Sequence, residues 1–216
     1  MKMRYLIVCG GKIDKEFGLN EIKTDGIDAI IAADSGMDFL YENGVTPDII
    51  VGDFDSATTK ALEFFERKGQ TEIHRLNPIK DDTDTEYAIR LAISEGARSI
   101  VLLGATGSRI DHVLGNISLL GIGLESGTDI SIIDTNNRIR MADKPVTIEK
   151  SAQYGRFVSL IALTDDNEVS LKGFKYPVTD YSFDRFTSLG ISNEIVDDHA
   201  LIDIHRGKFI IIESKD

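Results

Sequence analysis

The chain has 216 residues but only one cysteine, four prolines and no tryptophan. A single cysteine excludes a disulfide within the chain, and this favours a reducing compartment. Long hydrophobic runs are also missing, because the apolar stretch near the start is too short for a signal peptide or a membrane span. We therefore expect a cytoplasmic protein with no membrane partner, in which Cys9 is a small core residue.

Basic residues are scarce relative to acidic ones, with 24 Lys and Arg against 36 Asp and Glu and a net charge of −12. This balance argues against nucleic acid and anionic membranes as partners, because both are bound through basic patches. It does not exclude a phosphate substrate that is delivered with a divalent cation. It would also suit a cationic small molecule.

The chain up to about residue 125 alternates short apolar runs with helical patterns. Such alternation predicts right-handed βαβ units and a parallel sheet. Most of the runs are apolar throughout, as is typical of strands whose two faces are both covered by helices. The predicted strands are residues 5–9, 29–33, 49–51, 72–76 and 99–103, and the predicted helices are 36–43, 59–68, 83–95 and one that begins near Asp111.

From about residue 129 the pattern becomes strand-like, starting with "DISIID", and few helical stretches remain. Arg206 and Gly207 stand between two such strands as a predicted hairpin turn. This half is predicted to be an antiparallel sandwich. The fold class is therefore an N-terminal α/β domain with a parallel sheet, residues 1–138, followed by a C-terminal antiparallel β-sandwich domain, residues 139–216.

Acidic residues follow the third predicted strand in "VGDFDS". In an extended chain Asp53 and Asp55 would face one side while Phe54 faces the other, towards apolar surface. Two carboxylates this close repel each other unless a positive group lies between them, and a hard cation such as Mg²⁺ prefers such ligands. The alternative is a solvated turn, since Asp and Ser are common turn residues.

Polar residues also follow the other predicted strands, at the edge of the sheet where ligands bind in open parallel folds. "KDDTDTE" begins a helix, and either Asp81 or Asp82 is expected to be its N-cap. Asp81 and Asp84 are three residues apart and would share a helix face, while Lys80 could meet a phosphate. The same acids are also explained by the helix dipole alone.

The loop "GATGSRIDH" after the fifth predicted strand combines small residues with a basic one. Gly104 and Gly107 would let backbone N–H groups approach a phosphate or ribose, and Arg109 could form paired hydrogen bonds to phosphate oxygens. The alternative is a tight turn in which Asp111 caps the following helix.

In the second half, residues 174–186 hold five of the sixteen Phe and Tyr side chains. These aromatics could stack on a flat ring, form a subunit interface or build the sandwich core. The following stretch "GISNE" supplies Ser192 and Asn193, small polar groups suited to the edge of a heterocycle.

Together, the stretches "AADSG", "VGDFDS", "KDDTDTEYA", "GATGSRIDH", "KYPV" and "GISNE" resemble the thiamine pyrophosphokinase family. The resemblance covers residues 32–194 and implies transfer of the pyrophosphoryl group of ATP to the hydroxyl of thiamine, giving thiamine diphosphate and AMP. It implies an ATP- and Mg²⁺-binding first domain, a thiamine-binding second domain, and a homodimer in which both subunits build the thiamine site.

The resemblance also implies roles for individual residues. The expected Mg²⁺ ligands are Asp53, Asp55, Asp81 and Asp84. The expected catalytic residues are Asp53, Asp55, Asp84, Arg109 and Asp111. The residues expected to bind ATP or thiamine are Gly11, Asp34, Ser56, Lys80, Gly104, Thr106, Gly107, Arg109, Ser192 and Asn193. Leu189 departs from the family pattern, which has a basic residue there, and no general base stands out.

Two other functions compete with this interpretation. A haloacid-dehalogenase-type phosphatase also opens with a strand and Asp-x-Asp, but its motif continues with Thr or Val where this chain has Ala57. A non-catalytic nucleotide sensor with a β effector domain would not explain the dense acidic residues. Formation of AMP from Mg-ATP and thiamine separates the three, because the phosphatase would release phosphate and the sensor nothing.

Overall fold

The computed structural model describes residues 3–54, 59–77 and 82–216, which fold as two compact units divided between Thr135 and Asn136. Four residues with predicted roles lie outside the described residues: Asp55, Ser56, Lys80 and Asp81. No helix in the described part of the chain is long and apolar enough to cross a membrane.

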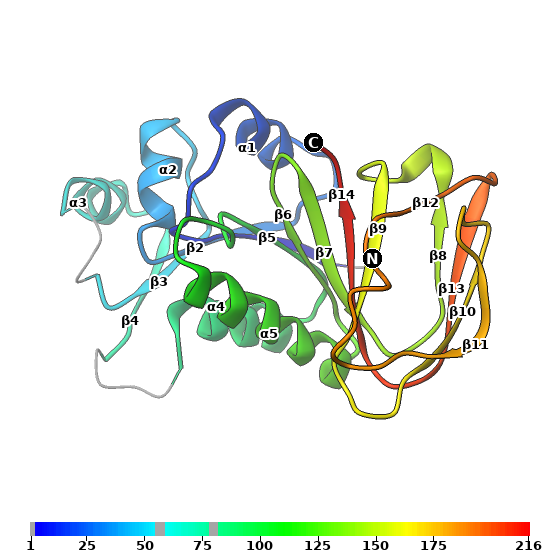
Figure 1. Ribbon diagram of the computed structural model, residues 1–216. Helices are drawn as coiled ribbons and strands as arrows, with labels where there is room; N and C mark the ends of the chain where they lie inside the picture. Colours follow the sequence, from blue (N-terminus) through cyan, green and yellow to red (C-terminus); the bar gives the residue numbers. More distant parts are fainter. Residues whose placement is uncertain (1–2, 55–58, 78–81) are drawn as a thin grey trace. The chain divides into compact units, whose positions relative to one another are not determined.

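The first unit contains a parallel sheet, as the sequence predicted, in the order β4-β3-β2-β1-β5-β6 (Figure 1). Its strands are β1 (Met3–Val8), β2 (Ala29–Ala33), β3 (Ile49–Gly52), β4 (Glu72–Arg75), β5 (Ala97–Leu103) and β6 (Asp129–Ile133). The central strand β1 is buried on both faces, with Leu6, Ile7 and Val8 at most 1% exposed. This double burial is why residues 5–8 are all largely apolar, with no alternation of apolar and polar side chains.

Helices cover both faces of this sheet (Figure 1). In Figure 1 the first three helices lie on one face and the last two on the other. Their bounds are α1 (Lys15–Ile22), α2 (Gly36–Glu42), α3 (Thr59–Lys68), α4 (Asp84–Ser94) and α5 (Ile110–Ser126). The strand order reverses between β1 and β5, so the loops after these two strands diverge and leave a crevice at the carboxyl ends of the strands.

The second unit consists of two antiparallel sets of strands, in the orders β12-β9-β14-β7 and β11-β10-β13-β8. Its elements are β7 (Asn137–Ala142), β8 (Val146–Glu149), η1 (Lys150–Ala152), β9 (Phe157–Ala162), β10 (Glu168–Lys172), β11 (Val178–Ser182), β12 (Asn193–Glu194), β13 (His199–Arg206) and β14 (Phe209–Ser214). One apolar core joins the two sets, with Val158 and Phe209 from one and Val169 and Ile202 from the other. The predicted sandwich class is therefore confirmed.

Two local expectations are wrong, and one helix was missed. The stretch "DISIID" forms β6, which pairs in parallel with β5 instead of joining the antiparallel half. Arg206 and Gly207 do not close a hairpin, because β13 pairs with β8 and β10 whereas β14 pairs with β7 and β9. Gly207, with φ of +88°, instead turns the chain from one set to the other. The short helix α1 was not predicted.

Candidate active site

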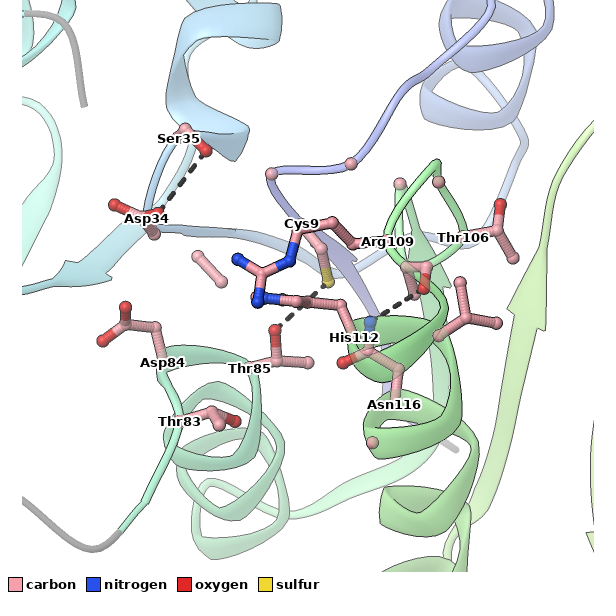
Figure 2. A pocket seen from close by; sticks show the side chains of 18 of the residues that line it. Cys9, Asp34, Ser35, Thr83, Asp84, Thr85, Thr106, Arg109, His112 and Asn116 are labelled. Atoms are coloured by element: carbon pink, nitrogen blue, oxygen red, sulfur yellow. Dashed lines mark hydrogen bonds between the residues drawn. The ribbon is translucent and has the colours of Figure 1, made fainter. Parts of the chain in front are cut away.

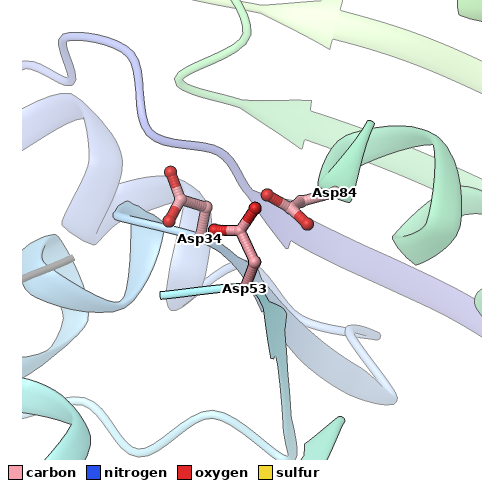
Figure 3. Close-up of side chains that lie close together, drawn as sticks. All are labelled: Asp34, Asp53 and Asp84. Carbon is pink, nitrogen blue, oxygen red and sulfur yellow. The ribbon is translucent and has the colours of Figure 1, made fainter. Parts of the chain in front are cut away.

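Three carboxylates converge in the first unit. Asp34 follows β2, Asp53 follows β3 and Asp84 begins α4. Figure 3 shows the three side chains pointing towards one another, and one oxygen of each lies within 4.8 Å of the others. All three are half-buried, so solvent only partly screens their mutual repulsion. This is the arrangement that a divalent cation with oxygen ligands stabilises.

The backbone around two of these acids adopts an unusual conformation. Asp34 has φ of +50° and Phe54 has φ of +62°, in the left-handed region that non-glycine residues seldom enter. Asp34 is held there by its N–H, which donates to the Val51 carbonyl over 2.8 Å. Such strain gathers at functional sites, where the surrounding structure holds it in place.

The left-handed Phe54 contradicts the expectation of an extended chain through the Asp-x-Asp stretch. β3 ends at Gly52, so the alternation of strand side chains does not apply beyond it. Phe54 nevertheless packs against the core of the first unit, as expected. The side of the chain on which Asp55 lies remains a prediction.

Asp84 is placed by the start of α4. The N-cap is Thr83, whose hydroxyl oxygen accepts from the Glu86 N–H over 3.2 Å, and not Asp81 or Asp82 as expected. The spacing Thr83-x-x-Glu86 matches a capping box, a signal that the acidic run obscured in the sequence. Asp84 therefore occupies the first helical turn, where the helix dipole favours a negative charge.

A cavity of about 810 Å³ opens at the crevice between the loops that follow β1 and β5 (Figure 2). Gly11 and Gly104 form its floor, and the Gly11 N–H donates to the Gly104 carbonyl over 2.8 Å. A Cβ atom on Gly11 would lie 2.3 Å from that carbonyl oxygen. Glycine is therefore required here for the two loops to meet, and the cavity lies in the size range of small-molecule sites.

Most of the described residues with predicted nucleotide roles line this cavity. They are Gly11, Asp34, Asp84, Gly104, Thr106, Gly107, Arg109 and Asp111. The sequence interpretation missed several others that also line it, namely Lys12, Thr85, His112 and Asn116. Lys12 follows a strand, and Thr85 and His112 lie in the first turn of a helix at the same edge of the sheet, which was the available signal, whereas Asn116 lies further along α5.

Arg109 and Asp111 form an exposed ion pair at the cavity, with 2.6 Å between Arg109 Nη2 and Asp111 Oδ2. The hydrogen bond from Arg109 lowers the pKa of the Asp111 carboxyl below its usual value. The alternative in which Asp111 caps the helix is wrong, because the N-cap position is Arg109 and Asp111 lies in the first turn. The paired guanidinium leaves Asp111 ionised at neutral pH.

Two further contacts fix the walls of the cavity (Figure 2). The Asn116 amide donates to the Ala105 carbonyl over 2.8 Å and ties the loop after β5 to α5. The Thr85 hydroxyl donates to Cys9 Sγ over 3.7 Å. Cys9 is 3% exposed, as expected of a core residue, and burial raises the pKa of its thiol to about 12.

In the second unit, the two predicted thiamine-binding residues differ in exposure. Ser192 is exposed with φ of +60°, and its N–H donates to Ser159 Oγ over 3.0 Å. Asn193 is only 7% exposed, and its side chain is hydrogen-bonded to the backbone of Tyr176. The structure therefore leaves Ser192 accessible and encloses Asn193.

Comparison with known proteins gives matches in both units. Residues 23–132 match the family model described as thiamin pyrophosphokinase, catalytic domain, and residues 145–209 match the one described as thiamin pyrophosphokinase, vitamin B1 binding domain. A thiamine pyrophosphokinase from Bacillus subtilis is 35% identical over 188 residues, which cover 86% of this chain and 87% of that protein.

Solved structures agree with these matches. A thiamine pyrophosphokinase structure from Bacillus subtilis matches with a TM-score of 0.89 and 31% identity, covering 99% of each chain. A thiamin pyrophosphokinase structure from Geobacillus thermodenitrificans matches with a TM-score of 0.86 and 29% identity, covering 99% of this chain and 98% of that one. The family predicted from the motifs is thus confirmed, and the chain belongs to the thiamin pyrophosphokinase family.

Proposed function

We propose that Asp34, Asp53 and Asp84 hold the divalent cation for the reaction of this family, in which the chain transfers the pyrophosphoryl group of ATP to thiamine. The observation that supports this most strongly is the convergence of the three carboxylates beside the switch-point cavity. The cavity would then hold the nucleotide, with the glycine-lined loops after β1 and β5 near its phosphates or ribose.

The donor set fits Mg²⁺. Carboxylate oxygens are its preferred protein ligands, and Mg–O distances of about 2.1 Å place ligand atoms on opposite sides of the ion roughly 4 Å apart. The three oxygens lie within 4.8 Å of one another, which is compatible with this separation. When bound, the cation would neutralise charge on the phosphate oxygens. The predicted ligands Asp55 and Asp81 remain candidates for the same site.

The reaction needs positioning and charge compensation more than covalent chemistry. The hydroxyl oxygen of thiamine attacks the β-phosphorus, the bond from that phosphorus to the oxygen shared with the α-phosphate breaks, and AMP leaves. The hydroxyl proton is released to the solvent. The chain contributes the cavity that aligns the two substrates and the guanidinium of Arg109, which can bind phosphate oxygens.

We assign Asp111 to orientation of Arg109. A carboxyl whose pKa is lowered is a weak proton acceptor near neutral pH, so Asp111 is poorly suited to act as a general base. Its ion pair with Arg109 holds the guanidinium beside this carboxylate at the cavity. We expect the phosphates of ATP to compete for, or share, the same guanidinium.

The second unit is proposed to bind thiamine, and the active enzyme to be a cytoplasmic homodimer in which the thiamine site combines residues of both subunits. The loop before Ser192 carries large exposed apolar side chains, with Phe186 91%, Leu189 62% and Ile191 48% exposed. Such side chains suit a surface that becomes covered by a second subunit.

Product analysis tests the reaction. Purified enzyme is incubated with ATP, MgCl₂ and thiamine, and the nucleotides and thiamine phosphates are separated. AMP and thiamine diphosphate should form in equal amounts, and a chelator should abolish the reaction until Mg²⁺ is restored. Formation of ADP and thiamine monophosphate would mean transfer of a single phosphoryl group, and this would reject the proposal.

A further inference from the structure

Two segments of the second unit that carry separate sequence motifs lie side by side. Residues 173–176, which include the start of "KYPV", run antiparallel to residues 193–196, which include the end of "GISNE". The Lys175 N–H donates to the Glu194 carbonyl over 2.8 Å, and the Val196 N–H donates to the Gly173 carbonyl over 2.9 Å. These backbone bonds form a short ladder between the motifs.

At Asn193 the pairing between the two segments is made by a side chain instead of the backbone. The backbone of Asn193 pairs with Val158 of β9, so it is turned away from Tyr176. The side-chain amide takes its place, because Oδ1 accepts from the Tyr176 N–H over 3.1 Å and Nδ2 donates to the Tyr176 carbonyl over 2.9 Å. A primary amide can replace a peptide group in this way because it carries one acceptor and donors in one plane.

Hydrogen bonds within the protein therefore occupy most of the hydrogen-bonding capacity of the Asn193 side chain. Its Oδ1 also accepts from the Glu194 N–H over 2.9 Å, and the residue is 7% exposed. The Glu194 carboxylate also has partners within the protein, because it forms ion pairs with Arg156 Nε at 2.8 Å and Lys175 Nζ at 3.0 Å. The side chains of Ser192, just before the second segment, and of Tyr176, which is 62% exposed, are accessible, as are those of Lys175 and Val196.

We propose that Asn193 is a positioning residue that sets the thiamine-facing surface by fixing the backbone of Tyr176, and that it does not read the thiamine ring itself. This inference rests on the proposed thiamine-binding role of the second unit. In this arrangement Tyr176 and Ser192 face the substrate, and Asn193 holds them at a constant separation. Aromatic and hydroxyl groups of this kind suit a flat heterocycle with polar edges.

Two substitutions separate the functions of the amide. Asn193→Ala removes all three hydrogen bonds. Asn193→Asp keeps an acceptor for the N–H groups of Tyr176 and Glu194 but loses the donor to the Tyr176 carbonyl. A positioning role therefore predicts graded effects in the order wild type, Asp, Ala.

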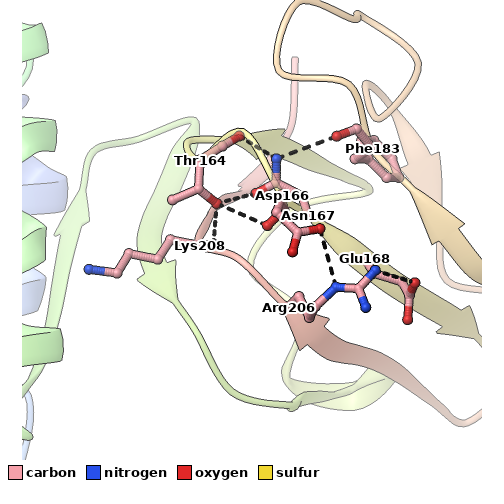
Figure 4. Close-up of polar contacts among 7 residues, drawn as sticks. All are labelled: Thr164, Asp166, Asn167, Glu168, Phe183, Arg206 and Lys208. Carbon is pink, nitrogen blue, oxygen red and sulfur yellow. Dashed lines mark hydrogen bonds and ion pairs between the residues drawn. The ribbon is translucent and has the colours of Figure 1, made fainter.

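The chain offers a matched control in Asn167, another buried asparagine of the same unit that is 2% exposed (Figure 4). Its amide bonds Thr164 and also donates to the Phe183 carbonyl over 3.4 Å. Asn167→Ala removes a comparable buried amide without touching Tyr176. It should lower thermal stability while leaving the Michaelis constants for thiamine and ATP unchanged.

The experiment combines amide hydrogen exchange of the unliganded protein with steady-state kinetics of the same variants. In Asn193→Ala we expect the Tyr176 amide to exchange about tenfold faster or more, because it loses its acceptor. The KM for thiamine should rise by about tenfold, while kcat and the KM for ATP stay within about twofold of wild type. Asn193→Asp should be intermediate in both measurements.

Several results would overturn the inference. One is unchanged exchange at Tyr176 in Asn193→Ala, and another is an equal rise in both Michaelis constants. A third is an Asn193→Asp variant with wild-type exchange but the thiamine KM of the alanine variant, which would mean that the amide contacts the ring directly. If wild type forms no AMP and thiamine diphosphate, the proposed function fails, and the exchange of Tyr176 still decides whether Asn193 fixes that segment.

Discussion

At the scale of single residues, Cys9 shows how burial determines the reactivity of a side chain. The thiol lies at the floor of the cavity but is 3% exposed, and burial raises its pKa to about 12. Because the thiolate is the reactive form, a thiol that stays protonated beneath the loops should be inert. Its position beside the proposed nucleotide site therefore does not make it a catalytic group.

We expect Cys9, the chain's one cysteine, to react with a thiol reagent at pH 8 far more slowly in native than in urea-unfolded protein. The folded pKa is raised, so its contribution to stability is complete below the unfolded pKa of about 9 and is lost as the pH rises towards 12. Labelling followed by absorbance measures the first effect. Native labelling as fast as unfolded labelling would contradict it.

The ion pair of Arg109 and Asp111 gives a second prediction. In Arg109→Gln the Asp111 carboxyl loses the charged donor that lowers its pKa, so that pKa should rise towards its ordinary value. A carbon-detected NMR titration of the Asp111 carboxyl measures this directly. Turnover of Arg109→Gln should also fall, because phosphate binding is weakened. An Asp111 pKa that is the same in the variant and in wild type would show that the two side chains do not pair in solution.

Single residues also show the limits of the sequence. Asp34 follows a strand at the same edge of the sheet as the other acids, so a role near the nucleotide could be predicted. Its place beside Asp53 and Asp84 could not, because that depends on the left-handed backbone at Asp34 and Phe54. The residue types Asp and Phe do not predict a left-handed backbone, because tertiary contacts impose this conformation.

At the scale of elements, the start of α4 affects both the stability of the fold and the proposed cation site. Thr83→Ala removes the cap on the Glu86 N–H and should lower the free energy of unfolding by about 1 kcal/mol. It should also weaken cation binding, since Asp84 is the next residue. Thr83→Ser retains the capping oxygen and is the control. Equal urea midpoints for the two variants would refute the capping role.

β14 contains the most enclosed charge of the second unit. Glu213 is 0% exposed and pairs with Arg138 Nη2 at 2.7 Å and Arg140 Nη2 at 2.9 Å. Glu213→Gln leaves two partly buried guanidinium groups without their counter-ion, so it should lower the free energy of unfolding by roughly 3 kcal/mol.

The control for this prediction is Glu168→Gln, which removes an ion pair to the more exposed Arg206. Exposed pairs contribute little, and we expect a loss below about 1 kcal/mol. Urea unfolding monitored by circular dichroism compares the two variants. Similar losses would show that burial of Glu213 does not set the strength of its ion pairs.

Element prediction succeeded where one local rule was decisive. The inner strands β2 and β3 of the first unit were found because burial on both faces makes them apolar, whereas the edge strand β4 is mostly polar. β6 was assigned to the wrong kind of sheet because its sequence shows strand character but not its partner. The turn at Gly207 was identified, but strands that follow one another in sequence need not pair, and only the core shows that the chain changes sets there.

At the scale of the whole molecule, the two units carry different halves of the predicted chemistry. The acids and the cavity belong to the first, and Ser192 with its neighbours belongs to the second. The order of the two kinds of unit could be predicted from the change in periodicity. The assembly of subunits could not, because one chain does not show which exposed apolar side chains a second copy covers.

A shared site predicts complementation between two inactive variants. Asp53→Asn removes a proposed cation ligand, and Ser192→Arg places a positive charge at the proposed site of the cationic thiamine. Random reassociation of equal amounts gives roughly half mixed dimers, each with one intact site, so activity should recover to about a quarter of wild type. Each variant must first be shown to be nearly inactive alone, and subunit exchange must be demonstrated with tagged chains. Exchange without recovery would refute the shared site.

The central claim is that Asp34, Asp53 and Asp84 form one cation site. Asp34→Asn tests it best, because asparagine keeps the size of the side chain and tolerates φ of +50° while removing one charge. Asp38→Asn, on the neighbouring helix α2 and outside the cluster, removes the same charge and is the control.

Titration with Mn²⁺, followed by electron paramagnetic resonance of the free ion, measures the affinity of that site in each protein. Three carboxylates on one ion predict that Asp34→Asn weakens Mn²⁺ binding by at least about tenfold, while Asp38→Asn leaves it near wild type. Equal Mn²⁺ affinity of Asp34→Asn and wild type would contradict a cation site formed by these three carboxylates.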